Sequence, residues 1–456
     1  MLFSRRNFLK GAVGASFTAS DDVSFASQNI QTGQSLRSIP FLRGTNYSGQ
    51  ESGGSVHAFP FKKSIDYLAM KGVSILRFPF SMERMLPQPG ADLNAAYANR
   101  CSSAINYILS KGMYVILDPH NGGRFLLNAA IDPYNVRGGS VVVIGESSKF
   151  SIEHFADFHT KLTQRFRHPR IIHGLMNEPH QQDDALLYQT HQAAINALRE
   201  AKYSGLILVN GNNWNTLAWG VASQNRTYMP ALVDPLENWA IDAHHYLDPW
   251  SSGTSDVVAP DYMDALIAFT EFARSAGMKA FLGEIGASRD QISLEAAVSA
   301  LGYVEGNKDV FLGWTWWTAV QYQPDYRYQL LPNELTSSDA SGPYTDTHQM
   351  KVLETIFRAA SAKPNLIFQP TLIGEPIEGS ILGGLPSVAT GYPVPSRSII
   401  WRRDSEDILG ANHTTYVLNA LDVGQQISRV EIWRNSVGQL ETSTLKTDHV
   451  KPRRAE

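Results

Sequence analysis

The sequence predicts a (β/α)8 TIM barrel, in the α/β class, followed by a small C-terminal all-β module. Between about residues 39 and 362, eight short apolar runs alternate with longer amphipathic runs. The short runs are apolar almost throughout, which is typical of strands buried on both faces of a parallel sheet. Eight such units over roughly 320 residues match the size of this barrel. A doubly wound open sheet is the competing topology, but no glycine-rich phosphate-binding fingerprint follows the first strand.

The predicted strands are rich in β-branched and aromatic residues, and the predicted helices repeat apolar residues at spacings of three and four. The strands cover residues 41–46, 75–80, 114–119, 173–176, 206–210, 239–244, 280–284 and 311–316. The helices cover residues 64–71, 95–111, 152–167, 185–202, 262–276, 294–304 and 347–360. The connection between the fifth and sixth strands contains no clear helical pattern.

The chain begins with the pattern of an export signal. The pair Arg5-Arg6 precedes a mildly apolar stretch over residues 11–19, and Ser24-Phe25-Ala26 fits a cleavage site. We therefore expect residues 1–26 to be a bacterial twin-arginine signal, so that the mature protein is secreted or periplasmic. Residues 27–363 would then form the barrel domain.

The pattern changes after the barrel. Residues 364–376 are rich in proline and glycine and predict a linker, and short alternating segments at 398–402, 415–418 and 427–433 predict strands. With Trp401-x-Arg403-Asp404 and Thr415-Tyr416-x-Leu418, residues 377–446 resemble a bacterial Ig-like repeat, which implies a β-sandwich. Trp401 and Tyr416 would anchor its core, and 447–456 would be a solvated tail. Its role is open between a spacer, an aid to carbohydrate binding and a cell-surface contact.

Composition excludes several classes of protein. Lys plus Arg number 39 and Asp plus Glu number 43, a formal net charge of −4, so the basic surface typical of nucleic-acid binding is missing. The single cysteine, Cys101, excludes an intramolecular disulfide framework and any CxxC motif. No apolar run is long enough to predict a membrane-spanning helix.

Polar side chains stand at the carboxyl ends of the predicted strands, where this barrel carries its active groups. They include Arg77, His120, Asn177 with Glu178, Asn212 to Trp214, His244 with Tyr246, Glu284 and Trp317. Glu178 and Glu284 end the fourth and seventh strands. Two carboxylates across one cleft can hydrolyse a glycosidic bond, because one protonates the leaving oxygen while the other attacks carbon or activates water.

An ordered set of motifs makes this interpretation specific. They are Arg43-Gly44, Asp118-Pro119-His120-Asn121, Asn177-Glu178-Pro179, His244-His245-Tyr246-Leu247-Asp248, Gly283-Glu284 and Gly313-Trp314-Thr315-Trp316-Trp317. Over roughly residues 40–360 the chain resembles glycoside hydrolase family 5, in particular its fungal endo-β-1,4-glucanase branch. The resemblance implies a retaining endo-β-1,4-glucanase that acts on a β-glucan polysaccharide or oligosaccharide without cofactor or metal.

The resemblance also implies roles for individual residues. Glu178 would be the general acid and base, and Glu284 the nucleophile of a double displacement. Asn177 would bind the 2-hydroxyl of the sugar at the cleaved bond, and Arg77 with Tyr246 would orient Glu284. His120, His244 and Trp317 would line the subsite on the nonreducing side.

These roles carry electrostatic expectations. Arg77 and Tyr246 should lower the pKa of Glu284, whereas the charge of Glu284 should raise the pKa of Glu178 above that of an ordinary glutamate. A retaining mechanism needs the two carboxyl groups about 5–5.5 Å apart. Further sugars could stack on exposed aromatic rings, for which the candidates are Trp214, Trp219, Trp250 and Tyr47.

Other interpretations stay open at this stage. A β-mannanase and a mixed-linkage or β-1,3-glucanase would share the same catalytic set. A non-catalytic glycan-binding or adhesion protein would need neither Glu178 nor Glu284. A metal hydrolase would use His120, His244 and His245, although no His-x-x-x-His spacing occurs. We expect a monomer that binds no nucleic acid and does not span a membrane.

Overall fold

Eight parallel strands close into a barrel in the computed structural model, which describes residues 39–51, 59–131, 136–217, 223–337 and 342–453. The barrel strands, in spatial order, are β1 (Leu42–Ser48), β12 (Phe311–Val320), β11 (Ala280–Gly286), β10 (Trp239–Tyr246), β9 (Ile207–Asn210), β8 (Ile171–Gly174), β3 (Tyr114–Pro119) and β2 (Ile75–Phe80). The predicted fold class is therefore confirmed. The expected signal over residues 1–26 lies outside the described residues.

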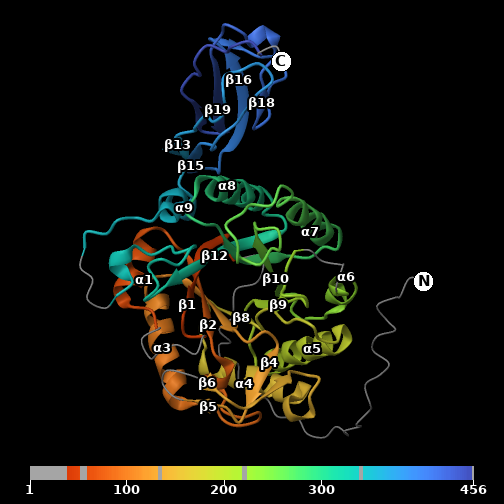
Figure 1. The fold of residues 1–456 in the computed structure, drawn as a ribbon. Helices are drawn as coiled ribbons and strands as arrows, with labels where there is room; N and C mark the ends of the chain where they lie inside the picture. The colour runs from red at the N-terminus through yellow and green to blue at the C-terminus, as the bar shows by residue number, and fades with distance from the viewer. Residues whose placement is uncertain (1–38, 52–58, 132–135, 218–222, 338–341, 454–456) are drawn as a thin grey trace, which may run out of the picture.

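Helices surround the barrel (Figure 1). They are α1 (Lys62–Met70), α3 (Ala95–Ser110), α4 (Ile152–Arg165), α5 (Asp184–Glu200), α7 (Asp264–Ser275), α8 (Gln291–Gly306) and α9 (His348–Arg358). Several begin at a side chain that accepts a hydrogen bond from the first turn, as Asn94, Asp183, Asp290 and Thr347 do. Between β9 and β10 lies only the short α6 (Asn225–Tyr228) with a 3-10 turn, in line with the missing helical pattern.

Smaller elements decorate the loops on the β3 side. A short helix, α2 (Met82–Met85), follows β2. After β3, the strand β4 (Arg124–Leu127) pairs with β7 (Ser140–Val143), and β5 (Ala130–Ile131) pairs with β6 (Val136–Arg137).

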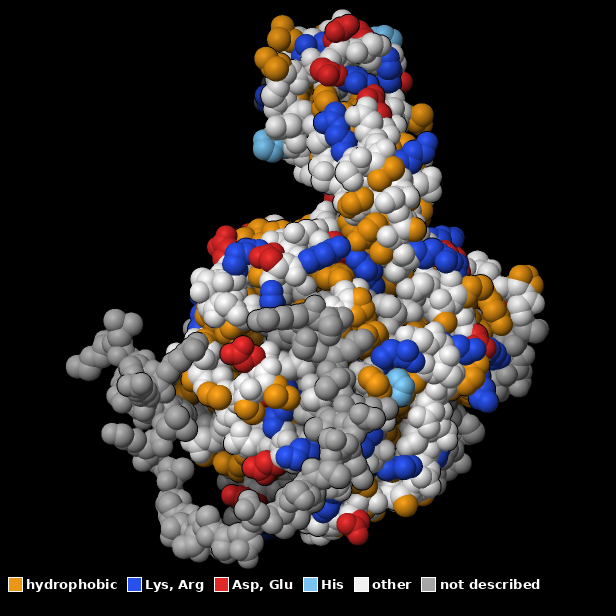
Figure 2. Space-filling view, turned by 180° about the vertical axis from the view of Figure 1, so that it is seen from behind, with side chains coloured by type: hydrophobic (Ala, Val, Ile, Leu, Met, Phe, Trp, Pro, Cys, Tyr) orange, Lys and Arg blue, Asp and Glu red, His pale blue; other side chains and the backbone are white. Residues whose placement is uncertain are grey.

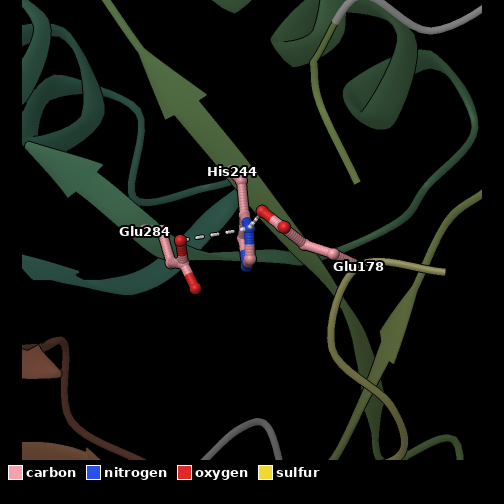
Figure 3. A group of neighbouring side chains, drawn as sticks. All are labelled: Glu178, His244 and Glu284. Atoms are coloured by element: carbon pink, nitrogen blue, oxygen red, sulfur yellow. Dashed lines mark hydrogen bonds and ion pairs between the residues drawn. The ribbon is translucent and has the colours of Figure 1, made fainter. Parts of the chain in front are cut away.

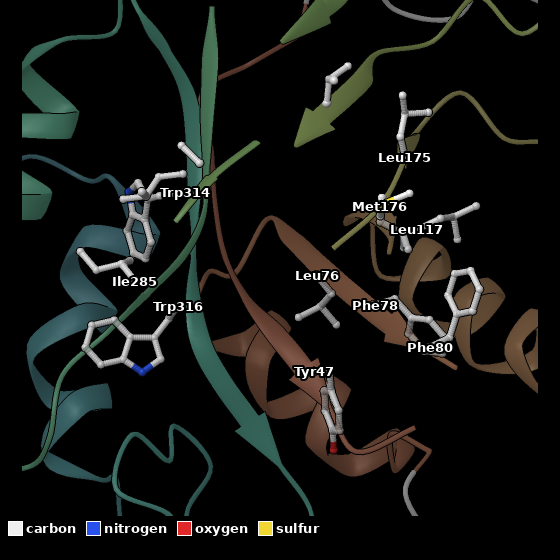
Figure 4. Close-up of a cluster of buried hydrophobic side chains, with 14 of the residues drawn as sticks. Tyr47, Leu76, Phe78, Phe80, Leu117, Leu175, Met176, Ile285, Trp314 and Trp316 are labelled. Carbon is white, nitrogen blue, oxygen red and sulfur yellow. The ribbon is translucent and has the colours of Figure 1, made fainter. Parts of the chain in front are cut away.

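Aromatic and aliphatic side chains fill the space between strands and helices (Figure 4). Trp314 and Trp316, which both come from β12, are fully buried there. Trp316 is thus a core residue, as alternation along the strand requires if Trp317 faces the other way. Tyr47 is also fully buried, so the suggestion that it stacks on sugar is wrong.

A small all-β module follows α9. Its strands are β13 (Ala362–Phe368), β14 (Ile381–Leu382), β15 (Val388–Tyr392), β16 (Ser396–Arg403), β17 (Glu406–Asp407), β18 (Tyr416–Val417), β19 (Ile427–Asn435) and β20 (Gly438–Ser443). They form a four-stranded sheet, β17-β16-β19-β20, and two pairs, β13-β15 and β14-β18. Trp401 is fully buried in its core and stacks on Tyr416 at 5.5 Å between ring centroids.

Two boundaries differ from expectation. The range 364–376 includes most of β13, which pairs with β15, so the chain enters the module without an extended linker. The range 447–456 includes Val450 and Lys451, which form bridges to Val423 and Ile377. The linker was expected because this range is rich in proline. Pro364 nevertheless lies in a strand, β13, which has a single partner, and a missing N–H is tolerated in such a strand.

The module is docked on the barrel through an apolar contact. Leu294 and Val298 of α8 and Val352 of α9 form one buried cluster with module residues that include Val388 and Trp433. Figure 2 shows hydrophobic side chains at this narrow join, whereas positive and negative side chains are interspersed over the described surface of the same face. The join therefore has the character of a small core.

A charged group reinforces the join. Arg43 of β1 pairs with Glu305 of α8 at 2.7 Å and donates a hydrogen bond to the Tyr392 hydroxyl of β15, also at 2.7 Å.

In the described part of the chain, no helix is both long and apolar enough to cross a membrane.

Candidate active site

The barrel interior changes from apolar to polar toward the carboxyl ends of the strands. A lower layer contains Ile75, Ile116, Leu208 and Ala240, and two residues further along the same strands stand Arg77, Asp118, Asn210 and Asp242. Residues two apart on a strand face the same side. The polar layer is almost completely buried, and it supports the groups at the mouth of the barrel.

Glu284 lies on β11 and is 3% exposed. Its Oε1 accepts a hydrogen bond from Arg77 Nη1 at 2.9 Å, and its Oε2 accepts one from the Tyr246 hydroxyl at 2.7 Å. A fixed cation and a phenol donor hold the carboxylate in one orientation. Its partners come from β2 and β10, so the closed barrel is what brings them together.

Glu178 follows β8 and lies on the opposite side of His244 from Glu284 (Figure 3). Its Oε1 lies 2.7 Å from Nδ1 of His244, and Nδ1 lies 3.5 Å from Oε2 of Glu284 (Figure 3). One oxygen of each glutamate and this nitrogen all lie within 4.8 Å of one another. Glu178 has a φ of 44°, a strained value for a non-glycine residue that is typical of functional sites.

The pKa directions in this substrate-free site are the reverse of the expectation. Burial raises the pKa of Glu178, but the hydrogen bond and charge of His244 outweigh burial and the net shift is downward. Burial raises the pKa of Glu284, and the charge of Glu178 adds to this against the opposing charges of His244 and Arg77. His244 therefore lowers the pKa of both carboxyls, and more strongly that of its hydrogen-bond partner Glu178.

Arg77 is completely buried and connects Glu284 to other residues of the polar layer. Besides Glu284, it donates to Asn177 Oδ1 at 2.7 Å and to Asn46 Oδ1 at 3.0 Å. It also pairs with Asp118 at 2.9 Å and Asp242 at 3.6 Å.

The other wall of the cleft is aromatic. The Trp317 ring stacks on His120 with centroids 5.5 Å apart and an interplanar angle of 18°. Its Nε1 donates to the Tyr326 hydroxyl at 2.9 Å. Trp317 is thus fixed with its ring beside His120, in contrast to the buried Trp316.

Trp214 stands apart from this group. It is 41% exposed and stacks face to face on His180, 4.5 Å between centroids. It belongs to a run, Asn213-Trp214-Asn215, in which all three residues have positive φ. Trp250 is 82% exposed, and Trp219 lies outside the described residues.

The structure brings together eight of the nine predicted site residues, namely Glu178, Glu284, Arg77, His120, Asn177, His244, Tyr246 and Trp317. Sequence reasoning assigned no role to Asn46, Asp242 or Tyr326, which contact them. The spacing Asp242-x-His244 indicates that Asp242 faces the same side of its strand as His244, because residues two apart share a face. The spacing Asp118-x-His120 indicates the same for Asp118. Tyr326 comes from a loop and gave no such indication.

Glu178, His244 and Glu284 offer two oxygens and one nitrogen of the kind that bind zinc. His245, the third histidine considered for a metal, is buried and does not belong to this group. Arg77 lies beside Glu284 with a permanent positive charge, which opposes a second cation there. The donor set therefore fits acid and base chemistry better than a resident metal.

Comparison with known proteins gives consistent findings from a family model, from sequence relatives and from solved structures. A family model described as Cellulase (glycosyl hydrolase family 5) matches residues 40–320. Endoglucanase 1 of Robillarda sp. is 34% identical over 276 residues, which covers 58% of this chain and 70% of the relative.

Solved structures agree with the sequence relatives. An endo-beta-1,4-glucanase from Xanthomonas axonopodis pv. citri superposes with a TM-score of 0.61 at 30% identity, over 70% of this chain and 98% of the other. A structure of XacCel5A in complex with cellopentaose superposes with a TM-score of 0.59 at 28% identity, over 69% and 98%.

Proposed function

The chain belongs to the cellulase family, glycosyl hydrolase family 5, and from this premise we propose that it is a retaining endo-β-1,4-glucanase. It hydrolyses internal β-1,4-glucosidic bonds of cellulose-type glucans. The observation that carries the proposal is the pair Glu178 and Glu284, each of which places one carboxylate oxygen within 4.8 Å of the other's and of a His244 ring nitrogen. Inverting enzymes need about 6.5–9.5 Å between the carboxyl groups to admit a water.

Glu284 is the nucleophile in this proposal. Each oxygen of its carboxylate accepts one hydrogen bond, from Arg77 or from Tyr246, and these bonds fix the orientation of the carboxylate for attack. Attack on the anomeric carbon breaks the bond to the leaving oxygen and forms a glycosyl-enzyme ester.

Glu178 gives its proton to the leaving oxygen and then takes one from the water that hydrolyses the ester. In the substrate-free site its partner is His244 at 2.7 Å. Esterification removes the charge of Glu284, so the proton balance of the pair changes during each turnover, as a group that is first acid and then base requires.

Product analysis tests the substrate and the bond. We expect soluble β-1,4-linked oligosaccharides from carboxymethylcellulose and barley β-glucan, and slower release from mannan and xyloglucan. NMR of the first product should show the β-anomer. Release from mannan alone would instead indicate a β-mannanase, and binding without any release a glycan-binding protein.

Matched variants test the roles. Glu284→Gln and Glu178→Gln should each lower kcat on carboxymethylcellulose by several orders of magnitude. Glu271→Gln, an exposed glutamate on α7, is the control and should leave kcat unchanged. Equal activity of Glu284→Gln and wild type would remove Glu284 from the mechanism.

We propose that the C-terminal module is an Ig-like domain that acts as a rigid extension of the barrel. Its exposed large hydrophobic side chains, among the described residues, are all aliphatic: Ile373, Ile381, Leu409, Val417, Leu421, Val437 and Leu445. Sugar-binding surfaces use aromatic rings. Pull-down on insoluble cellulose should therefore be unaffected by Leu409→Asp with Leu421→Asp.

We also propose that residues 1–26 are a twin-arginine export signal and that the enzyme acts outside the cytoplasm. In a bacterial host, Arg5→Lys with Arg6→Lys should retain the protein in the cytoplasm. Unchanged export of that variant would contradict the proposal.

A further inference from the structure

Four buried or half-buried side chains beneath the two glutamates form a closed ring of hydrogen bonds and one ion pair. Arg77 Nη2 donates to Asn177 Oδ1 at 2.7 Å, and Asn177 Nδ2 lies 3.2 Å from His120 Nε2. His120 Nδ1 lies 2.8 Å from Asp118 Oδ2, which Arg77 Nη1 approaches at 2.9 Å. The ring begins and ends at the same guanidinium.

Arg77 fixes the direction of every bond in the ring. A guanidinium can only donate, so the carbonyl oxygen of the Asn177 amide faces it. The NH2 group of Asn177 therefore faces His120, whose Nε2 has to accept. The hydrogen of the imidazole then stands on Nδ1, where Asp118 receives it.

Asp118 suits this position because an ionised carboxylate only accepts. Burial lowers the pKa of His120 and the charge of Asp118 raises it, with a net upward shift to about 9. A proton on Nε2, however, would meet the amide hydrogen of Asn177 at 3.2 Å. The neutral ring with its hydrogen on Nδ1 is the form in which no two donors face each other, and in that form Asp118 makes Nε2 a stronger acceptor.

We propose that Asp118 is a positioning residue for the reaction. It acts through His120 to hold the amide of Asn177 in the orientation that binds the 2-hydroxyl of the sugar at the cleaved bond. This inference rests on the proposed function, in which Asn177 binds that hydroxyl.

Asp118→Asn removes the negative charge of the ring without changing its shape. Oδ2 of Asp118 is the atom that both His120 Nδ1 and Arg77 Nη1 approach, so an amide that keeps its oxygen there retains both contacts and loses only the charge that favours hydrogen on Nδ1. If the amide turns round, its NH2 meets both nitrogens and moves the imidazole hydrogen to Nε2, against Asn177. Either orientation weakens the hold on the Nδ1 hydrogen.

Asp242→Asn is the matched control. Asp242 is as buried as Asp118 and also forms an ion pair with Arg77, at 3.6 Å, but it accepts its hydrogen bond from Asn210 and faces His244 at 4.0 Å. It makes no hydrogen bond to His120 or Asn177. Any general damage to the polar layer should appear in both variants.

The experiment measures kcat/KM on 2,4-dinitrophenyl β-cellobioside and on its analogue deoxygenated at C2 of the sugar that carries the aryl group. The ratio of the two values reports the 2-hydroxyl contact alone and is independent of the folded fraction. We expect Asp118→Asn to lower the ratio roughly 10-fold or more, and Asp242→Asn to leave it within about twofold of wild type. An unchanged ratio in Asp118→Asn overturns the proposal.

A second measurement needs no variant at position 118. In ¹⁵N spectra of the wild-type protein, the imidazole assigned by His120→Gln should carry hydrogen on Nδ1 and none on Nε2 at the working pH. A doubly protonated ring or hydrogen on Nε2 overturns the proposal. If wild type hydrolyses no cellobioside while this tautomer is found, the proposed function has failed and the ring has not.

Discussion

Arg77 is a single permanent cation near four carboxylates, Asp118, Asp242, Glu178 and Glu284. Its charge acts to lower the pKa of each of these carboxyl groups. Its hydrogen bonds also fix the amides of Asn46 and Asn177, whose Oδ1 atoms accept from it. Because one cation cannot neutralise four carboxylates, the net charge of the group also depends on the protonation of the neighbouring histidines and of the glutamates themselves. His244 lies between the two glutamates, with Nδ1 2.7 Å from Glu178 and 3.5 Å from Glu284.

Tyr246→Phe tests how Glu284, the proposed nucleophile, is kept ionised. The change removes the hydroxyl that donates to Glu284 at 2.7 Å, and a hydrogen bond to the charged form lowers a pKa. The pKa of Glu284 should therefore rise, and the acid limb of the kcat/KM profile should move to higher pH. We expect kcat/KM at the optimum to fall about 10- to 100-fold.

Tyr328→Phe is the control for this change. Its ring stacks on Tyr246 at 6.1 Å, but its hydroxyl donates to the backbone of Ser255. Its acid limb should coincide with that of wild type. An identical acid limb in both variants would mean that Tyr246 does not act on the charge of Glu284.

Among the elements, β10 explains why much of the site was predictable. Asp242, His244 and Tyr246 alternate with apolar or buried neighbours, and polar side chains at such positions are costly unless they are used. What the sequence could not reveal is the irregularity between Ala243 and His244, where the register with β11 shifts and His244 comes opposite Glu284. This register places His244 between the glutamates, and the pKa expectation failed because that contact was unknown.

Strand β11 offers a test of packing within the barrel. A Cβ added at Gly283 would lie 2.0 Å from Oδ1 of Asp242, so Gly283→Ala should displace a buried carboxylate. We expect a loss of about 2 kcal/mol or more in the free energy of unfolding, measured by urea denaturation. Activity should fall with it, because Glu284 is the next residue.

Gly306→Ala at the end of α8 is the comparison. A Cβ there meets nothing within 4 Å, and alanine favours helix. This variant should be as stable as wild type or slightly more so. Equal stability of the Gly283 variant would show that Asp242 has room to move.

For the whole molecule, the apolar join predicts that barrel and module unfold together. Val298 is fully buried in the cluster shared with Val388 and Trp433. Calorimetry should give a single transition, and Val298→Asp should lower its midpoint because a charge is buried without a partner. Leu409→Asp, at a fully exposed position on the module, should leave the midpoint unchanged. Two separate transitions in wild type would contradict the docking.

Buried neutral histidines make the molecule sensitive to mild acid. Burial lowers the pKa of His159 to about 3 and those of His191 and His245 to about 4, and it lowers the pKa of His173 as well. In the unfolded chain these imidazoles titrate near 6.5. Between about pH 6.5 and pH 4 the unfolded state therefore binds more protons, and stability falls as pH falls. The pKa values of His168 and His180 are lowered too, whereas a histidine with a raised pKa, such as His244, is protonated in both states below its unfolded pKa of about 6.5 and adds little to the slope there.

The slope of unfolding free energy against pH measures this difference. Each histidine that is protonated only in the unfolded state adds about 1.4 kcal/mol per pH unit, so a net excess of two or more should lower stability steeply near pH 5.5, above the range of ordinary carboxylates. His191→Phe should reduce the slope by about one proton. His413→Phe, at an exposed position on the module, is the control variant. A flat profile from pH 7 to pH 5 would mean that these side chains gain protons in the folded protein, and that the barrel opens to water around them.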